Sequence, residues 1–114
     1  MFALRPGTTV ILAGDPAALL AVGQRVQQSA SDILHLAWSL HARGEKDGAV
    51  TLRVEPSSLP AQGYRISIRP SGVELIGADG PGLFYAAATF SQLLRQSPAG
   101  LPAGEIRDWP DFPV

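Results

Sequence analysis

The sequence contains no cysteine, which excludes disulfide bridges, a thiolate nucleophile and zinc sites built on thiolates. It also lacks an excess of charge of either sign, because 9 basic and 10 acidic residues give a formal net charge of -1. No basic field therefore indicates nucleic acid or an anionic membrane as a partner. No apolar run approaches the ~20 residues that a membrane-spanning helix needs. We expect neither a nucleic-acid partner nor a membrane partner.

The N-terminus lacks the features of an export signal. MFALRPGTTV has no basic start followed by an apolar stretch, so it is not a signal peptide as it stands. Localisation, either cytoplasmic or exported from a bacterium, stays open.

The composition is that of a globular protein, with 46% hydrophobic and 17% charged residues among 114. This length suits one domain with a single modest core.

The first part of the chain predicts a strand and then a helix. Residues 8–14 form a short apolar run rich in β-branched residues, which is typical of a buried strand. Asp15 suits the N-cap of a helix and Pro16 suits its first position. An apolar stripe at three- and four-residue spacing then predicts a helix to about Ala30. The stripe consists of Leu19, Val22, Gly23, Val26 and Ala30.

Residues 32–44, DILHLAWSLHARG, are ambiguous. Leu34, Leu36, Trp38 and Leu40 alternate with smaller or polar residues, and alternation favours a strand with one buried face. Continuation of the helix is the alternative, since Leu, Ala and His tolerate a helix. We favour the strand.

Three further strands and a second helix follow. Residues 49–55 alternate, and residues 64–77 read as a hairpin whose turn contains Pro70 and Gly72. A helix is expected from about Pro81, and the tail EIRDWPDFPV allows a short edge strand. The inward face of the second helix consists of Leu83, Ala86, Ala87, Phe90, Leu93 and Leu94. The expected fold class is α+β, with a mainly antiparallel sheet and two amphipathic helices on one face.

The stretch GADGPG, residues 77–82, has the layout of a phosphate-binding loop between a strand and a helix. A dinucleotide fingerprint requires Gly-x-Gly-x-x-Gly, whereas Gly77, Gly80 and Gly82 have the reversed spacing. Pro81 also removes a backbone N–H donor where a phosphate would need one. The stretch therefore predicts a tight corner at a helix start, and no cofactor is expected.

Other candidate chemistry is equally weak. His35 and His41 cannot share one metal ion on either a strand or a helix. Asp108 and Asp111 lie in a proline-broken tail, and the serines lack a nucleophile elbow. A row of outward arginines is interleaved with glutamates, which favours a neutralised solvent face over an anion site. The row consists of Arg53, Arg65 and Arg69. No catalytic, cofactor or metal residue is assigned.

A resemblance adds what the residues alone do not give. GYRISIRPSGVELIGADGPGLFYAAATFSQLL, followed by LPAGEIRDWPDFP, resembles the N-terminal accessory domain of glycoside hydrolase family 20, the β-N-acetylhexosaminidases. The shared features are the Tyr-Arg-Ile-Ser strand, the Pro-Ser-Gly hairpin, GLFYA opening a helix, and a tail of the form Asp-Trp-Pro-x-Phe-Pro. Asp111 departs from that tail, where the family usually has a basic residue.

The resemblance implies a zincin-like α+β domain placed before a (β/α)₈ barrel that carries the chemistry. That barrel uses an adjacent Asp-Glu pair together with the 2-acetamido group of the substrate, and this sequence has no adjacent Asp-Glu. We therefore expect residues 1–107 to form a non-catalytic domain and residues 108–114 to lead toward the barrel. Neither hydrolysis nor sugar binding by this chain alone is expected, and the barrel of the same parent chain is the expected partner.

The expected docking residues lie off the inward stripe of the second helix and in the tail. They are Phe84, Tyr85, Trp109 and Phe112. Exposed apolar groups of this kind mark interaction surfaces. Three alternatives stay open: a carbohydrate-binding module, an accessory domain of another glycosidase family, and a cofactor binder that uses residues 77–82.

Overall fold

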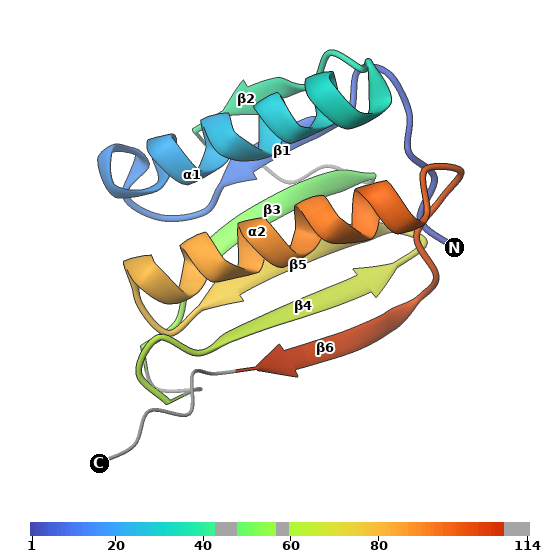
Figure 1. The fold of residues 1–114 in the computed structure, drawn as a ribbon. Helices are drawn as coiled ribbons and strands as arrows, with labels where there is room; N and C mark the ends of the chain where they lie inside the picture. Colours follow the sequence, from blue (N-terminus) through green and yellow to red (C-terminus); the bar gives the residue numbers. More distant parts are fainter. Residues whose placement is uncertain (43–47, 57–59, 109–114) are drawn as a thin grey trace.

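The computed structural model of the chain describes residues 1–42, 48–56 and 60–108. The described chain contains six strands and two α-helices, with α1 after β1 and α2 between β5 and β6 (Figure 1). The strands are β1 (Thr9–Leu12), β2 (Ser39–His41), β3 (Ala49–Val54), β4 (Tyr64–Arg69), β5 (Gly72–Gly77) and β6 (Gly104–Asp108). The helices are α1 (Pro16–Ser29) and α2 (Gly80–Gln96), and a π-helical turn, η1 (Ala30–Leu34), extends α1.

The six strands form one mixed sheet in the order β2-β1-β3-β5-β4-β6. The pairings β1–β2, β1–β3 and β3–β5 are parallel, whereas β4–β5 and β4–β6 are antiparallel. The expectation of a mainly antiparallel sheet was therefore wrong. The physical reason is that strands consecutive in sequence need not pair: β3 pairs with β5, and the helix between β1 and β2 returns the chain so that β2 runs parallel to β1.

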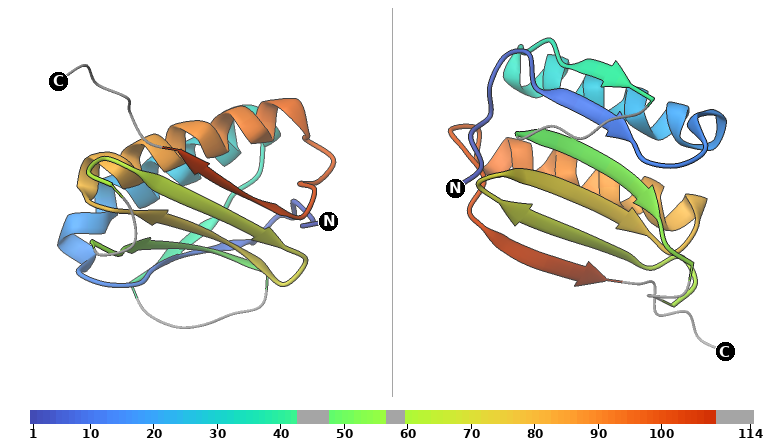
Figure 2. Two further views of the ribbon diagram at one scale, coloured as in Figure 1. Left: turned by 90° about the horizontal axis from the view of Figure 1, so that it is seen from below. Right: turned by 180° about the vertical axis from the view of Figure 1, so that it is seen from behind.

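Both helices lie side by side on one face of the sheet, so the α+β class with two helices on one face is confirmed (Figures 1 and 2). The predicted inward residues of both helices are buried, apart from Leu93, which is half-buried against the core. Phe90 is fully buried in the core, and the centroid of its ring lies 6.3 Å from the centroid of the Trp38 ring. One hydrophobic core therefore lies between the helix layer and the sheet.

The preference for a strand over residues 34–41 was only partly right. The helical path continues through η1 to Leu34, and His35 then adopts the left-handed conformation, with φ of 57°. Only Ser39–His41 form a strand. Trp38 is buried as expected, but it precedes that strand, and its indole Nε1 donates to the carbonyl of Arg5 at 2.9 Å. A side chain outside the sheet therefore produced part of the alternating pattern.

The start of the chain also enters the core, which no periodicity indicated. Phe2 is 1% exposed and forms an antiparallel bridge with Leu101. The Phe2 N–H donates to the Leu101 carbonyl at 2.7 Å, and the Leu101 N–H donates to the Phe2 carbonyl at 2.9 Å. This bridge fixes the first residues beside the connection between α2 and β6.

Candidate docking surface

The corner between β5 and α2 is a helix cap. Asp79 is the N-cap of α2, and its Oδ1 accepts the Gly82 N–H at 2.8 Å. Its Oδ2 accepts the N–H of Gln62 at 3.0 Å, which ties the loop before β4 to the same corner. The carboxylate of Asp79 thus occupies the position at the helix N-terminus that a bound phosphate would take. The prediction of a structural corner is confirmed.

The glycines of this corner allow close backbone approach. A Cβ atom on Gly77 would lie 2.3 Å from the Leu83 nitrogen, and one on Gly82 would lie 2.3 Å from the Gly63 carbonyl oxygen. Gly80, by contrast, has nothing within 4 Å of such an atom. Two of the three glycines are therefore required by packing. Their packing fixes the first turn of α2 and with it the directions of Phe84 and Tyr85.

Phe84 and Tyr85 lie at the surface of the helix layer, 44% and 42% exposed. Helical geometry separates these two residues by about 100°. Phe84 lies on the side of α2 that faces α1, where the guanidinium carbon of Arg25 is 4.6 Å from the centroid of its ring. We name Arg25, Phe84 and Tyr85 the docking patch, after the predicted docking role of Phe84 and Tyr85, which stays a prediction. The other two expected docking residues, Trp109 and Phe112, lie outside the described residues.

The two helices also contact each other through polar side chains, about one turn after Arg25 on α1 and two turns after Phe84 on α2. The hydroxyl groups of Ser29 and Ser91 are 2.6 Å apart. On the other side of α2, the Thr89 hydroxyl lies 2.7 Å from the Tyr64 hydroxyl on β4. Leu20, also exposed, precedes Ser29 by nine residues and so lies on the opposite side of α1, away from α2. Leu20 is therefore not part of the docking patch.

The outer surface of the helix layer has very little charge. Each α-helix contains one charged residue, Arg25 in α1 and Arg95 in α2, and neither contains Lys, Asp or Glu. Alanine and glutamine occupy most of the other exposed positions. A helix face in permanent contact with water usually carries more charge, whereas the centres of protein interfaces are depleted of Lys, Glu and Asp and enriched in aromatic residues and Arg.

The outer face of the sheet has the opposite character. Arg53 Nη2 lies 2.6 Å from Glu74 Oε2, and its Nε lies 2.9 Å from Glu55 Oε1. Arg65 Nη2 lies 3.8 Å from Glu55 Oε2. At the edge strand β6, the guanidinium of Arg107 accounts for most of the lowering of the Glu105 pKa below its ordinary value. The predicted neutralised face is confirmed for Arg53 and Arg65.

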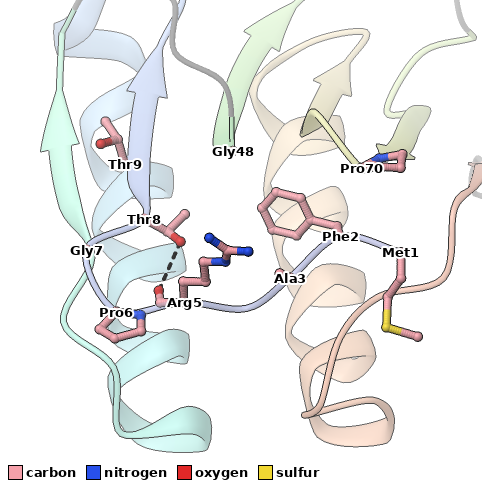
Figure 3. Close-up of a pocket in the computed structure, with 10 residues that line it drawn as sticks. All are labelled: Met1, Phe2, Ala3, Arg5, Pro6, Gly7, Thr8, Thr9, Gly48 and Pro70. Carbon is pink, nitrogen blue, oxygen red and sulfur yellow. Dashed lines mark hydrogen bonds between the residues drawn. The ribbon is translucent and has the colours of Figure 1, made fainter.

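An open pocket of about 500 Å³ lies at the N-terminal ends of β1 and β3 (Figure 3). Among the described residues that line it, Arg5 has the only charged side chain. Thr8 donates its hydroxyl hydrogen to the Arg5 carbonyl at 3.0 Å, as the dashed line in Figure 3 marks. These lining residues include no acid–base pair and no activated nucleophile, so they do not form an active site.

Residue types that ligate metals are dispersed in the described part of the chain. No three His, Cys, Asp or Glu side chains come together within residues 1–42, 48–56 and 60–108. His35 ends η1 and His41 lies on β2, and both are exposed. Of the described helices, none has both the length and the apolar character that crossing a membrane requires.

Residues 1–109 match the family described as glycosyl hydrolase family 20, domain 2. The chain belongs to this family. The family 20 resemblance predicted from the hairpin, the GLFYA helix and the tail is therefore confirmed.

Relatives of this family 20 domain are much longer proteins. A lacto-N-biosidase of Bifidobacterium bifidum is 37% identical over 68 residues, which are 59% of this chain and 6% of that protein. A beta-hexosaminidase of Akkermansia muciniphila is 36% identical over 62 residues, 52% of this chain and 13% of that protein. The N-acetyl-β-hexosaminidase of Streptomyces plicatus has the same fold, with a TM-score of 0.74 and 23% identity over 97% of this chain and 23% of that structure.

Phe84 and Tyr85 were predicted from the sequence as docking residues, whereas Arg25 was not. Phe84 and Tyr85 followed from the helical spacing of α2. Arg25 was missed because its ring partner lies on a different helix, 59 positions along the chain by the residue numbers. One available signal was the lack of acidic residues and lysine in both helices, which leaves their arginines without a partner on the same helix.

Proposed function

We propose that this chain is the non-catalytic N-terminal domain of a β-N-acetylhexosaminidase-type glycoside hydrolase that removes terminal N-acetylhexosamine residues. The membership of domain 2 of glycosyl hydrolase family 20 is the observation that carries the proposal. The names of two relatives, a beta-hexosaminidase and an N-acetyl-β-hexosaminidase, agree with it. The name of the lacto-N-biosidase agrees with the coarser statement that the relatives are glycosidases. In this proposal a (β/α)₈ barrel of the same polypeptide performs the reaction.

The proposed role of the domain is to pack on the barrel and stabilise it through the outer surface of the helix layer. The exposed rings of Phe84 and Tyr85 and the low charge of α1 and α2 support this choice of surface. Covering two half-exposed aromatic side chains removes apolar area from water, and aromatic residues contribute strongly at interface centres. Trp109 and Phe112 remain predicted members of the same contact.

The activity is tested with 4-nitrophenyl N-acetyl-β-D-glucosaminide on two proteins. One is the 114-residue chain and the other is the full product of the reading frame that contains it. We expect hydrolysis only by the longer protein. Hydrolysis by the 114-residue chain would overturn the non-catalytic role. Failure of the longer protein to release N-acetylhexosamine from any β-linked substrate would overturn the assignment of the reaction.

The exposed aromatic rings also suggest a second function, that of a carbohydrate-binding module. Such modules present open aromatic faces to sugar rings, but one face of Phe84 is covered by Arg25. Calorimetry of the 114-residue chain with chitobiose separates the two functions. We expect no binding heat, and saturable binding that is lost in Tyr85→Ala would favour the module.

A further inference from the structure

Arg25 is the charged member of the docking patch and lies beside the ring of Phe84. Its guanidinium lies over the Phe84 ring at 4.6 Å. No carboxylate within the described segments forms an ion pair with it, and neither helix contains an acidic residue. The cation is therefore held in place by a ring and by α1, with its N–H donors left for water or for a partner.

A surface that covers Phe84 must also cover Arg25. A guanidinium taken out of water without a partner is strongly unfavourable, whereas a hydrogen-bonded carboxylate compensates for the lost hydration. The planar fork of Arg matches a carboxylate in two parallel hydrogen bonds, and a guanidinium already stacked on a ring loses little freedom on forming them.

We propose that the surface of the catalytic barrel that packs on this domain presents an Asp or Glu carboxylate that pairs with Arg25 beside a pocket for Phe84. This inference rests on the proposed function, because it requires the barrel to cover the docking patch. It adds the chemical character of that barrel surface and makes Arg25 the residue that sets the register of the contact.

Arg95 provides a matched control. It is the other charged residue of α1 and α2, but it lies in the last turn of α2, three turns from Phe84 by residue number. There its charge lies at the negative end of the helix dipole. That attraction is reason enough for a cation at this position, so no interface is needed to explain it. Loss of its charge should leave the contact intact.

The test uses thiol labelling at Ala88→Cys, because residue 88 lies one turn after Phe84 on the outer side of α2 and the described chain has no cysteine of its own. The rate is measured in the full-length protein and in the 114-residue chain, with mass spectrometry to locate the label. A second site, Gln92→Cys, guards against local disturbance by the first. Ser67→Cys on the outer face of the sheet reports any general loosening.

Full-length protein should label at residue 88 about tenfold more slowly than the 114-residue chain. In the full-length protein, Arg25→Gln should raise the rate about tenfold, Arg25→Glu should raise it further through repulsion, and Arg25→Lys should raise it least. Arg95→Gln and labelling at residue 67 should show no change.

The outcomes separate the two claims. If residue 88 is protected in the full-length protein but Arg25→Glu labels no faster than Arg25→Gln, the barrel docks here without a carboxylate, and only this inference is overturned. If residues 88 and 92 label equally fast in both proteins, the helix layer is not the docking surface, and both claims are overturned.

Discussion

The two outer faces of this domain differ in how their charges are arranged. On the sheet, Arg53 lies between Glu55 and Glu74, so the charges are matched within the domain. On the helix layer, Arg25 lies over the Phe84 ring and has no acidic partner in the described part of the chain. The sheet face can stay in water without a partner. The helix face carries the exposed rings and the unmatched cation that an interface uses.

Neither of the two features that suggest a ligand site, the glycine-rich corner and the open pocket, carries catalytic chemistry in the described part of the chain. The glycine-rich corner resembles a phosphate loop, yet Asp79 fills its helix N-terminus. The pocket in Figure 3 has only one charged side chain among its described lining residues. The surface that distinguishes this domain is the helix face, which has few charges, and substitutions on the helix face and on the sheet face should therefore differ in their effects.

The largest effect is expected from Gly82→Ala, which should destroy the corner that directs Phe84. The added Cβ would meet the Gly63 carbonyl oxygen at 2.3 Å, so backbone must shift. We expect a loss of ~3 kcal/mol in the free energy of unfolding. Gly80→Ala is the control, since its Cβ meets nothing within 4 Å, and should cost less than ~0.5 kcal/mol. Urea denaturation of the 114-residue chain measures both, and equal stabilities would refute the packing argument.

Tyr85→Ser tests the helix face directly. In the full-length protein we expect a loss of ~2 kcal/mol in unfolding free energy, because the side chain would be buried at the proposed contact. In the 114-residue chain, where Tyr85 is 42% exposed, the loss should stay below ~0.5 kcal/mol. Thermal unfolding of both proteins gives the comparison. A loss of equal size in the two would mean that Tyr85 serves only its own domain.

Asp79→Ala tests the cap beneath the patch. Asp79 accepts two N–H donors, whereas Asp15 accepts one as the cap of α1. We expect the free energy of unfolding to fall by ~2 kcal/mol in Asp79→Ala and by ~1 kcal/mol in Asp15→Ala. Denaturant midpoints of the 114-residue chain measure the order of the two. The reverse order would show that the bond to Gln62 adds nothing to the cap.

The smallest effect is expected on the sheet face, from Arg53→Gln. Its ion pairs are partly exposed, with 38% of the Arg53 side chain accessible. Such pairs contribute less than ~1 kcal/mol, and salt should reduce the difference from the unmodified protein. The measurement is unfolding of the full-length protein at low and high sodium chloride. A loss larger than that of Tyr85→Ser would reverse the ranking of the two faces.

Local signals in the sequence predicted the elements well. The Asp15 cap, the start of α2 near Pro81 and the alternation of the β4–β5 hairpin each depend on residues within a few positions, and each is confirmed. The strand pairing was not predictable in the same way. The parallel neighbours of β1 and β3 are brought together by the path of the whole chain, and no local pattern encodes that path. The bridge between Phe2 and Leu101 was also not predictable from a local pattern, because the two residues lie at opposite ends of the sequence.

In the candidate site, too, features of a single helix were predictable and contacts between helices were not. Phe84 and Tyr85 were predicted because a helical wheel separates inward from outward positions on a single helix. Arg25 was not, because its relation to Phe84 depends on the way α1 lies beside α2. The tail residues Trp109 and Phe112 remain predictions outside the described part of the chain.

The central claim is that the helix face, and not the sheet face, packs on a catalytic barrel of the same polypeptide. The most direct test places the photoreactive residue p-benzoylphenylalanine at position 85 or at position 67 of the full-length protein. After irradiation, mass spectrometry identifies the linked peptides. We predict that position 85 links to the barrel and that position 67, on the outer face of the sheet, does not. Links to the barrel from position 67 and none from position 85 would contradict the account.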